Sequence, residues 1–180
     1  MVFALAILSK AGSLKGDRIE HASIAPPHLL QSIAELDLIV VTQPNFILER
    51  GDQYLRDISD GDIPTLYRCK GFIDQEIPLA GGTDAPFGTA NPWLAMQAAV
   101  SRCSLEGQIV NAAEALTPEQ AVSLFLGELE NPAKLRQLDA GAQAHMCLLD
   151  RNWNQARQSL DRVEVMATWR AGVLIHDAIN

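Results

Sequence analysis

The chain has 180 residues, of which 48% are hydrophobic and 20% charged. This composition is typical of a folded globular protein and excludes an intrinsically disordered one, and the length suits one domain or slightly more. The net charge of −8 and the scattered basic residues exclude a typical nucleic-acid binder, because contacts to phosphates need clustered lysines and arginines.

The three cysteines, Cys69, Cys103 and Cys147, form no CxxC pair. We therefore expect reduced structural thiols in a cytoplasmic protein rather than disulfides or a structural zinc site. The apolar residues 1–8 lack the basic start and cleavage site of a signal peptide and are too short to cross a bilayer. We interpret them as the end of a buried helix with Gly12 as its C-cap. The sequence thus predicts no membrane association and a chain that starts in the middle of a fold.

The first half of the chain alternates between strand-like and helix-like segments. In chain order we predict a strand over 18–23, a helix over 26–36, a strand over 38–42, a helix over 65–75 and a strand over 77–83. The segment 45–63, polar and rich in Asp, Gly and Arg, is expected to be a long loop with at most a turn of helix. Strands that alternate with helices in this way predict a parallel sheet with right-handed crossovers.

Beyond residue 84 the alternation stops. We predict helices over 92–103 and 118–129, the second with Thr117 and Gln120 as a capping box, and then short strands over 144–149, 163–168 and 173–176. Ala171 and Gly172 are expected to form the tight turn between the last two strands.

Two candidate site residues follow predicted strands: His21 the first and Asp84 the third. Because the carboxyl ends of parallel strands meet at one rim, both side chains should lie at the same edge of the sheet. An imidazole and a carboxylate are ligands that zinc-like ions prefer, and such a carboxylate can also accept a proton from metal-bound water. Taken singly, a histidine on a strand is more often a hydrogen-bonded core residue, and an aspartate before Ala-Pro a turn former.

Other residues predict chemistry less specifically. Gly81 and Gly82 could approach a phosphate in an independent small α/β enzyme, but the chain lacks the P-loop lysine and the GxGxxG spacing. Arg68 and Arg102 could bind an anionic substrate, although single arginines on amphipathic helices usually serve solvation. We expect that solvating role here.

A series of short motifs resembles, in order, the second half of an amidohydrolase of the YtcJ-like group in the amidohydrolase superfamily. The motifs are RIEHAS at 18–23, TQP at 42–44, YRC at 67–69, GTDAP at 82–86, LTPEQA at 116–121, LDAG at 138–141, CLLD at 147–150 and TWRAG at 168–172. Such enzymes are metal-dependent hydrolases that act mainly on carbon–nitrogen bonds other than peptide bonds. The resemblance implies an α/β fold in which residues 1–130 carry the last three strands and helices of a partial (β/α)8 barrel, and 131–180 the C-terminal strands of a small β-sandwich.

The resemblance also assigns roles to the two candidate residues. His21 would bind a divalent metal, zinc, at the end of barrel strand six. Asp84, at the end of strand eight, would bind the same metal and act as general base toward the attacking water, with a small amide-type molecule as substrate. The family's HxH on strand one, its Lys or Glu on strand four and its His on strand five have no counterpart in this sequence.

We therefore expect the chain to be the C-terminal part of such an enzyme, with weak metal binding and no appreciable hydrolase activity alone, because a catalytic metal site usually needs three protein ligands. The alternative is a non-catalytic protein derived from an amidohydrolase. It would form a homo-oligomer or dock onto another subunit through the exposed half-barrel surface.

Overall fold

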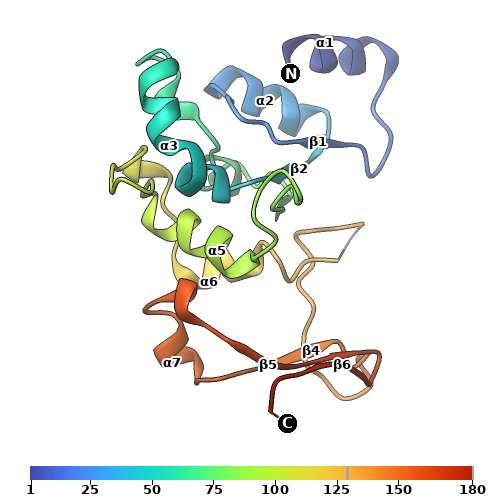
Figure 1. Cartoon of the computed structure of the whole chain (residues 1–180). Helices are drawn as coiled ribbons and strands as arrows, with labels where there is room; N and C mark the ends of the chain where they lie inside the picture. The colour runs from blue at the N-terminus through green and yellow to red at the C-terminus, as the bar shows by residue number, and fades with distance from the viewer. Residues whose placement is uncertain (129, 180) are drawn as a thin grey trace.

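The computed structural model describes residues 1–128 and 130–179. In this part of the chain, one three-stranded sheet lies in the upper half of the elongated molecule and another at its lower end, with α5 (Pro92–Ser101) and α6 (Pro118–Ser123) between them (Figure 1). The first sheet is parallel, in the order β1-β2-β3, and the second is antiparallel, in the order β4-β5-β6. The molecule is thus a mixed α/β protein, as the alternating pattern predicts.

The parallel sheet contains β1 (Arg18–Glu20), β2 (Ile39–Thr42) and β3 (Leu79–Gly81). In its register Ile19 stands beside Val40, and Val40 beside Leu79. These side chains belong to the main core together with the apolar face of α2 (Pro27–Glu35), while α1 (Val2–Ala11) ends at Gly12. The predicted helices and strands up to residue 42 are confirmed, with ends shifted by a few residues. The expectation that the first helix is buried is wrong, because Leu5 is the one buried residue of α1 and most of its other apolar side chains are exposed.

The predicted loop over 45–63 is wrong, because a helix, α3 (Asn45–Asp57), fills most of it. Gly51 suggested a loop, yet a side chain there would press against Ser104 and Val110, at 3.0 and 3.1 Å from the added Cβ. The glycine therefore lets α3 pack closely and does not end it. Polar residues such as Gln53 and Arg56 lie on the solvent side of the helix, while Phe46, Ile47 and the polar Asn45 are buried.

The predicted helix over 65–75 is largely wrong as well. It is replaced by the 3-10 turn η1 (Ile63–Thr65), an extended stretch and the short α4 (Lys70–Asp74). A helix is interrupted there because Leu66 pairs with Ile24 in an isolated bridge and Tyr67 has a left-handed backbone, with φ 39°. Interactions distant in sequence thus override the local helical pattern.

The C-terminal half follows the predicted order. The capping box at Thr117 and Gln120 is confirmed in both directions, at 3.2 and 3.0 Å. The helix after it, α6, ends at Ser123 and not near 129, and Leu129 itself lies outside the described residues. The remaining elements are η2 (Ala112–Glu114), β4 (Met146–Leu149), α7 (Trp153–Ala156), η3 (Leu160–Arg162), β5 (Val165–Arg170) and β6 (Val173–Asp177).

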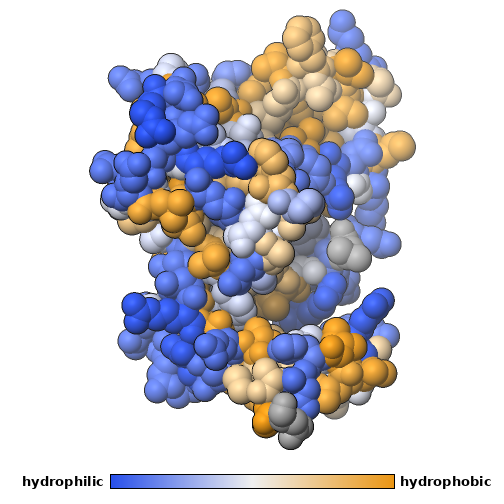
Figure 2. Space-filling model, viewed as in Figure 1, coloured by the Kyte–Doolittle hydropathy of each residue, from blue (hydrophilic) through white to orange (hydrophobic). Residues whose placement is uncertain are grey.

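Apolar side chains gather on two outer surfaces (Figure 2). One is α1, where Phe3 is 86% exposed, and the other is the C-terminal sheet, where every residue of β6 is exposed. Within the described residues, no helix has both the length and the apolar character that crossing a membrane would require.

Arg102 is completely buried, so the expectation that it serves solvation is wrong. It ends α5 in the left-handed conformation, and its guanidinium donates hydrogen bonds to the carbonyl oxygens of Leu66, Tyr67 and Val110 at 2.8, 2.7 and 3.0 Å. Burial lowers the pKa of this side chain, which shows the desolvation that the three bonds must offset.

Arg68 also has a structural role. Its Nε donates to Glu114 at 2.8 Å, and the other carboxylate oxygen of Glu114 accepts from the backbone N–H groups of Cys69 and Gly71. Burial raises the pKa of the Cys69 thiol to about 12, so this cysteine stays neutral. Arg102 thus holds the start of the segment 66–71, and Glu114, paired with Arg68, holds its end.

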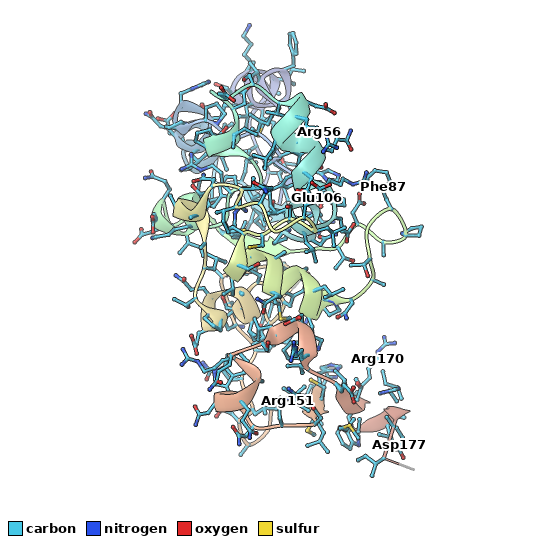
Figure 3. All side chains as sticks on the ribbon, turned by 60° about the vertical axis from the view of Figure 1, so that its left-hand side comes forward. Arg56, Phe87, Glu106, Arg151, Arg170 and Asp177 are labelled. Atoms are coloured by element: carbon cyan, nitrogen blue, oxygen red, sulfur yellow. The ribbon has the colours of Figure 1, made fainter. Side chains whose placement is uncertain are left out.

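Replacing Arg102 by methionine should destabilise the protein by about 3 kcal/mol, because three buried carbonyl oxygens lose a charged donor. Urea denaturation followed by circular dichroism measures this loss. The matched control is Arg56→Met on the outer side of α3 (Figure 3), which should change stability by less than about 0.5 kcal/mol. Equal effects of the two variants would contradict the anchoring role of Arg102.

Candidate functional site

The three parallel strands end at one rim, and hydrogen bonds continue the sheet just beyond them. The N–H of His21 donates to Val41 O and that of Gly82 to Thr42 O, both at 2.8 Å. The hydroxyl of Thr42 donates to His21 O at 3.0 Å. His21 and Asp84 therefore follow strands on either side of β2, as the sequence predicts. Adjacent strands lie about 4.8 Å apart, so the ends of β1 and β3 are separated by roughly 10 Å across β2.

His21 is held at the end of β1 by an unusual backbone and by an aromatic contact. Both His21 and Ala22 have positive φ, 66° and 45°, and the N–H of Ala22 returns to Glu20 O at 2.8 Å. The half-buried imidazole stacks on the ring of Phe46, with the centroids 6.5 Å apart and the planes within 8°. Left-handed residues other than glycine cost about 1 kcal/mol or more and cluster at functional sites.

Asp84 also has a left-handed backbone, with φ 56°, and its side chain is exposed. The N–H of Gly88 donates to Asp84 O at 3.0 Å and closes the loop. A Cβ on Gly88 would collide with Thr83 O and would come within 2.5 Å of the side-chain nitrogen of Asn45. Glycine is therefore required at position 88, where the loop packs closely against Thr83 and Asn45. The side chain of Asp84, in the same loop, is nevertheless exposed to solvent.

The first turns of α3 fix the loop that carries Asp84. Asn45, which is fully buried, donates from Nδ2 to Thr83 O and to Glu49 Oε1, both at 3.1 Å. The same oxygen of Glu49 accepts from the N–H of Thr89 at 3.0 Å. The loop is thus held on both sides of Asp84. Sequence reasoning missed these two residues because the segment was predicted to be a loop.

An aromatic cluster lies beside the rim. The Phe46 ring packs edge-on against Tyr67 and Phe87, and the Arg50 guanidinium lies 5.3 Å from the centre of the Phe46 ring and 4.1 Å from that of Phe87. Phe87 stands on the loop after β3, which projects from one side of the molecule (Figure 3). Burial raises the pKa of Tyr67, the hydrogen-bonded Tyr54 adds to this effect, and the negative charge of Asp84 makes a smaller contribution in the same direction.

The glycine pair does not form a phosphate site. The N–H of Gly81 donates to Leu124 O and that of Gly82 to Thr42 O, both at 2.8 Å, so neither is available to an anion. A Cβ on Gly81 would also come within 2.8 Å of the Phe125 ring. The small size of this residue therefore serves packing.

In the part of the chain that the structure describes, the rim offers fewer metal-binding side chains than a complete site contains. Among residues 1–128 and 130–179, no group of three or more His, Cys, Asp or Glu side chains is placed to hold a metal. A catalytic zinc site usually uses three protein ligands and one open position. His21 and Asp84 have suitable chemistry, but the described residues bring no third ligand to them.

The fold and the two polar strand ends define the class of protein. The chain matches the Amidohydrolase family over residues 1–176 and belongs to that family. It is 29% identical to YtcJ of Bacillus subtilis, which is named as an amidohydrolase, over 112 residues that cover 61% of this chain and 21% of YtcJ. It is 26% identical to the N-substituted formamide deformylase of Arthrobacter pascens over 169 residues, 89% of this chain and 31% of that protein. The chain thus spans less than a third of the length of these curated relatives.

Solved structures agree with this family. An uncharacterised metal-dependent hydrolase from Pyrococcus horikoshii matches 68% of this chain and 25% of its own, with 28% identity and a TM-score of 0.59. The ochratoxinase of A. niger matches 98% of this chain and 40% of its own with a TM-score of 0.62. Its identity of 21% shows the fold alone. The resemblance to YtcJ-like amidohydrolases is confirmed, and the chain has an amidohydrolase-type α/β fold.

Glu49→Ala should release the loop that carries Asp84, because Asn45 and Thr89 both donate to this carboxylate. We expect the amide of Thr89 to exchange with deuterium about tenfold faster, a local opening easier by about 1.4 kcal/mol. The measurement is hydrogen exchange by NMR. Gln53→Ala, on the exposed side of the same helix, should leave this amide unchanged. Unchanged exchange in Glu49→Ala would contradict the holding role.

Proposed function

We propose that the chain supplies the C-terminal part of a metal-dependent amidohydrolase, which hydrolyses carbon–nitrogen bonds other than peptide bonds by means of metal-activated water. The observation that carries this proposal is the placement of His21 and Asp84 at one rim of a parallel sheet, where His21 and Gly82, two residues before Asp84, are hydrogen-bonded to β2. Membership of the Amidohydrolase family supports the reaction class.

In this proposal His21 and Asp84 bind a divalent metal, zinc, which when bound supplies Lewis-acid chemistry. Asp84 also acts as the general base that takes a proton from the attacking water. Its exposure supports this role, because a base must be reached by water and substrate. His21, stacked on Phe46, would present a ring whose orientation is already restricted.

The same proposal assigns β1, β2 and β3 to strands six, seven and eight of a (β/α)8 barrel, in a domain that covers 1–130. Parallel pairing in chain order supports it. The antiparallel sheet of β4, β5 and β6 would belong to a small β-sandwich over 131–180. Closing such a barrel needs eight strands, so its remaining strands would lie outside the matched region.

The substrate would be a small amide-type molecule. The relative from Arthrobacter pascens is named for its action on N-substituted formamides, which favours an N-substituted amide here. We place the protein in the cytoplasm, because its cysteines include Cys147, exposed and unpaired in the described structure.

A second candidate function is self-association or docking onto another subunit. The exposed apolar residues of α1 favour it, since Val2, Phe3 and Ile7 are between 59% and 86% exposed. Sedimentation at micromolar concentration tests it, and a strictly monomeric chain would count against it.

For the metal site we expect weak zinc binding to the purified chain and no appreciable hydrolysis of amides, because two ligands make an incomplete site. Calorimetric titration with ZnCl2 should show an affinity that falls about tenfold or more in His21→Ala and in Asp84→Ala. His28→Ala, on the exposed start of α2, is the control and should bind zinc like the unchanged chain.

Two outcomes would contradict these assignments. If zinc copurifies at one ion per chain and survives gel filtration, the site is not incomplete. If neither His21→Ala nor Asp84→Ala changes the affinity, these residues are not the ligands.

A further inference from the structure

Polar side-chain atoms that are buried without a hydrogen-bond partner are confined to one short segment of the described structure. They are Gln43 Oε1, Asn45 Oδ1 and Arg50 Nε. Most buried polar atoms in folded proteins are paired, and each unpaired one costs about 1–3 kcal/mol. All of them stand at the junction of β2 and α3, beside the rim that carries His21 and Asp84. Ordinary packing does not explain such a concentration.

Two of these three side chains are already engaged in the fold through their other atoms. Asn45 donates to Thr83 O and Glu49, and Arg50 lies against the rings of Phe46 and Phe87. Their unpaired atoms can therefore be a by-product of a structural task. Gln43 is different, because within the described residues its side chain makes a single hydrogen bond, from Nε2 to Val41 O at the long distance of 3.5 Å.

Gln43 is also centrally placed. It directly follows β2, the middle strand, and is only 3% exposed. A Cβ added to Gly82 would lie 3.5 Å from its Nε2, so the amide group lies against the backbone two residues before Asp84. Rotation of the terminal amide breaks only the long contact to Val41, because this torsion has a broad, roughly two-fold profile. The amide oxygen can thus change direction at little cost while the rest of the side chain stays packed.

We propose that Gln43 determines substrate specificity by accepting a hydrogen bond from the N–H of a secondary amide, and so selects N-monosubstituted amides over tertiary ones. This inference rests on the proposed amidohydrolase function. A carbonyl oxygen that is buried without a donor is complementary to one N–H group, which a secondary amide has and a tertiary amide lacks. Sites built around a buried polar group reject analogues that leave the group unpaired.

The test uses the full 180-residue chain, labelled with 15N and studied by NMR in the presence of ZnCl2. The probes are N-butylformamide and N-butyl-N-methylformamide, which differ in the amide N–H. We expect N-butylformamide to shift the side-chain NH2 signals of Gln43 and to bind about fivefold more tightly than the tertiary amide.

Gln43→Leu should abolish this preference while leaving the melting temperature equal or higher, because it removes an unpaired buried polar atom. Gln75→Leu is the matched control, since Gln75 is exposed at the end of α4, and it should keep the preference. Gln43→Glu retains an acceptor oxygen and should keep the preference as well, which separates a specific contact from a packing effect.

Equal affinity of the two probes for the unchanged chain would overturn the inference, as would a preference that persists in Gln43→Leu or no binding of either probe. The failure of the proposed function is distinguishable. If zinc binding depends on His21 and Asp84 but the amide preference does not depend on Gln43, only this inference fails. If the amide preference depends on Gln43 but zinc affinity is unchanged in His21→Ala and Asp84→Ala, the proposed metal site is wrong and the amide subsite stands.

Discussion

The buried guanidinium of Arg102 is the interaction on which the rest of the molecule depends. It joins the end of α5 to the backbone of Leu66 and Tyr67 and to that of Val110. Withdrawing this charge from water is costly, as its lowered pKa shows, and three carbonyl oxygens offset the cost. Leu66 and Tyr67, which precede β3 in the chain, are thereby held in place by Arg102, which follows β3. Tyr67 can then keep its left-handed backbone and pack against Phe46.

The junction of β2 and α3 connects the segment that Arg102 holds to the rim. Phe46 stacks on His21, while its neighbour Asn45 binds the carbonyl group of Thr83, next to Asp84. The two proposed ligands follow different strands, yet both depend on the start of α3. Phe46 contacts His21 itself, and Asn45 contacts Thr83, the residue before Asp84. A movement of α3 would therefore displace both together. This coupling suits a site in which the spacing of the ligands must be maintained.

The sequence predicted the parts of the site that depend on local patterns. The rule that parallel strands end at one rim correctly brought together the strand ends that carry His21 and Asp84, and capping chemistry located α6. The pattern failed where distant contacts decide the outcome. Gly51 is a local sign of a loop, but it packs against Ser104 and lies inside α3. Arg102 follows an apolar helix and suggested a solvated cation, but its partners Leu66 and Tyr67 lie 36 and 35 positions earlier. Nothing local distinguishes such a buried arginine from an exposed one.

Backbone strain and unpaired polar atoms accumulate at the same rim. The described residues contain nine non-glycine positions with positive φ, and four of them, His21, Ala22, Tyr67 and Asp84, lie at the strand ends or in the aromatic cluster beside them. Each costs about 1 kcal/mol or more, and the unpaired oxygen of Gln43 adds a cost of similar size. If the rim served only to close the fold, ordinary backbone conformations and apolar side chains there would be more stable. Positive φ also occurs at Asp37 and Glu76, in the turns that lead into β2 and β3, but the rim combines it with buried polar atoms that lack partners, and such costs persist where function requires a particular geometry.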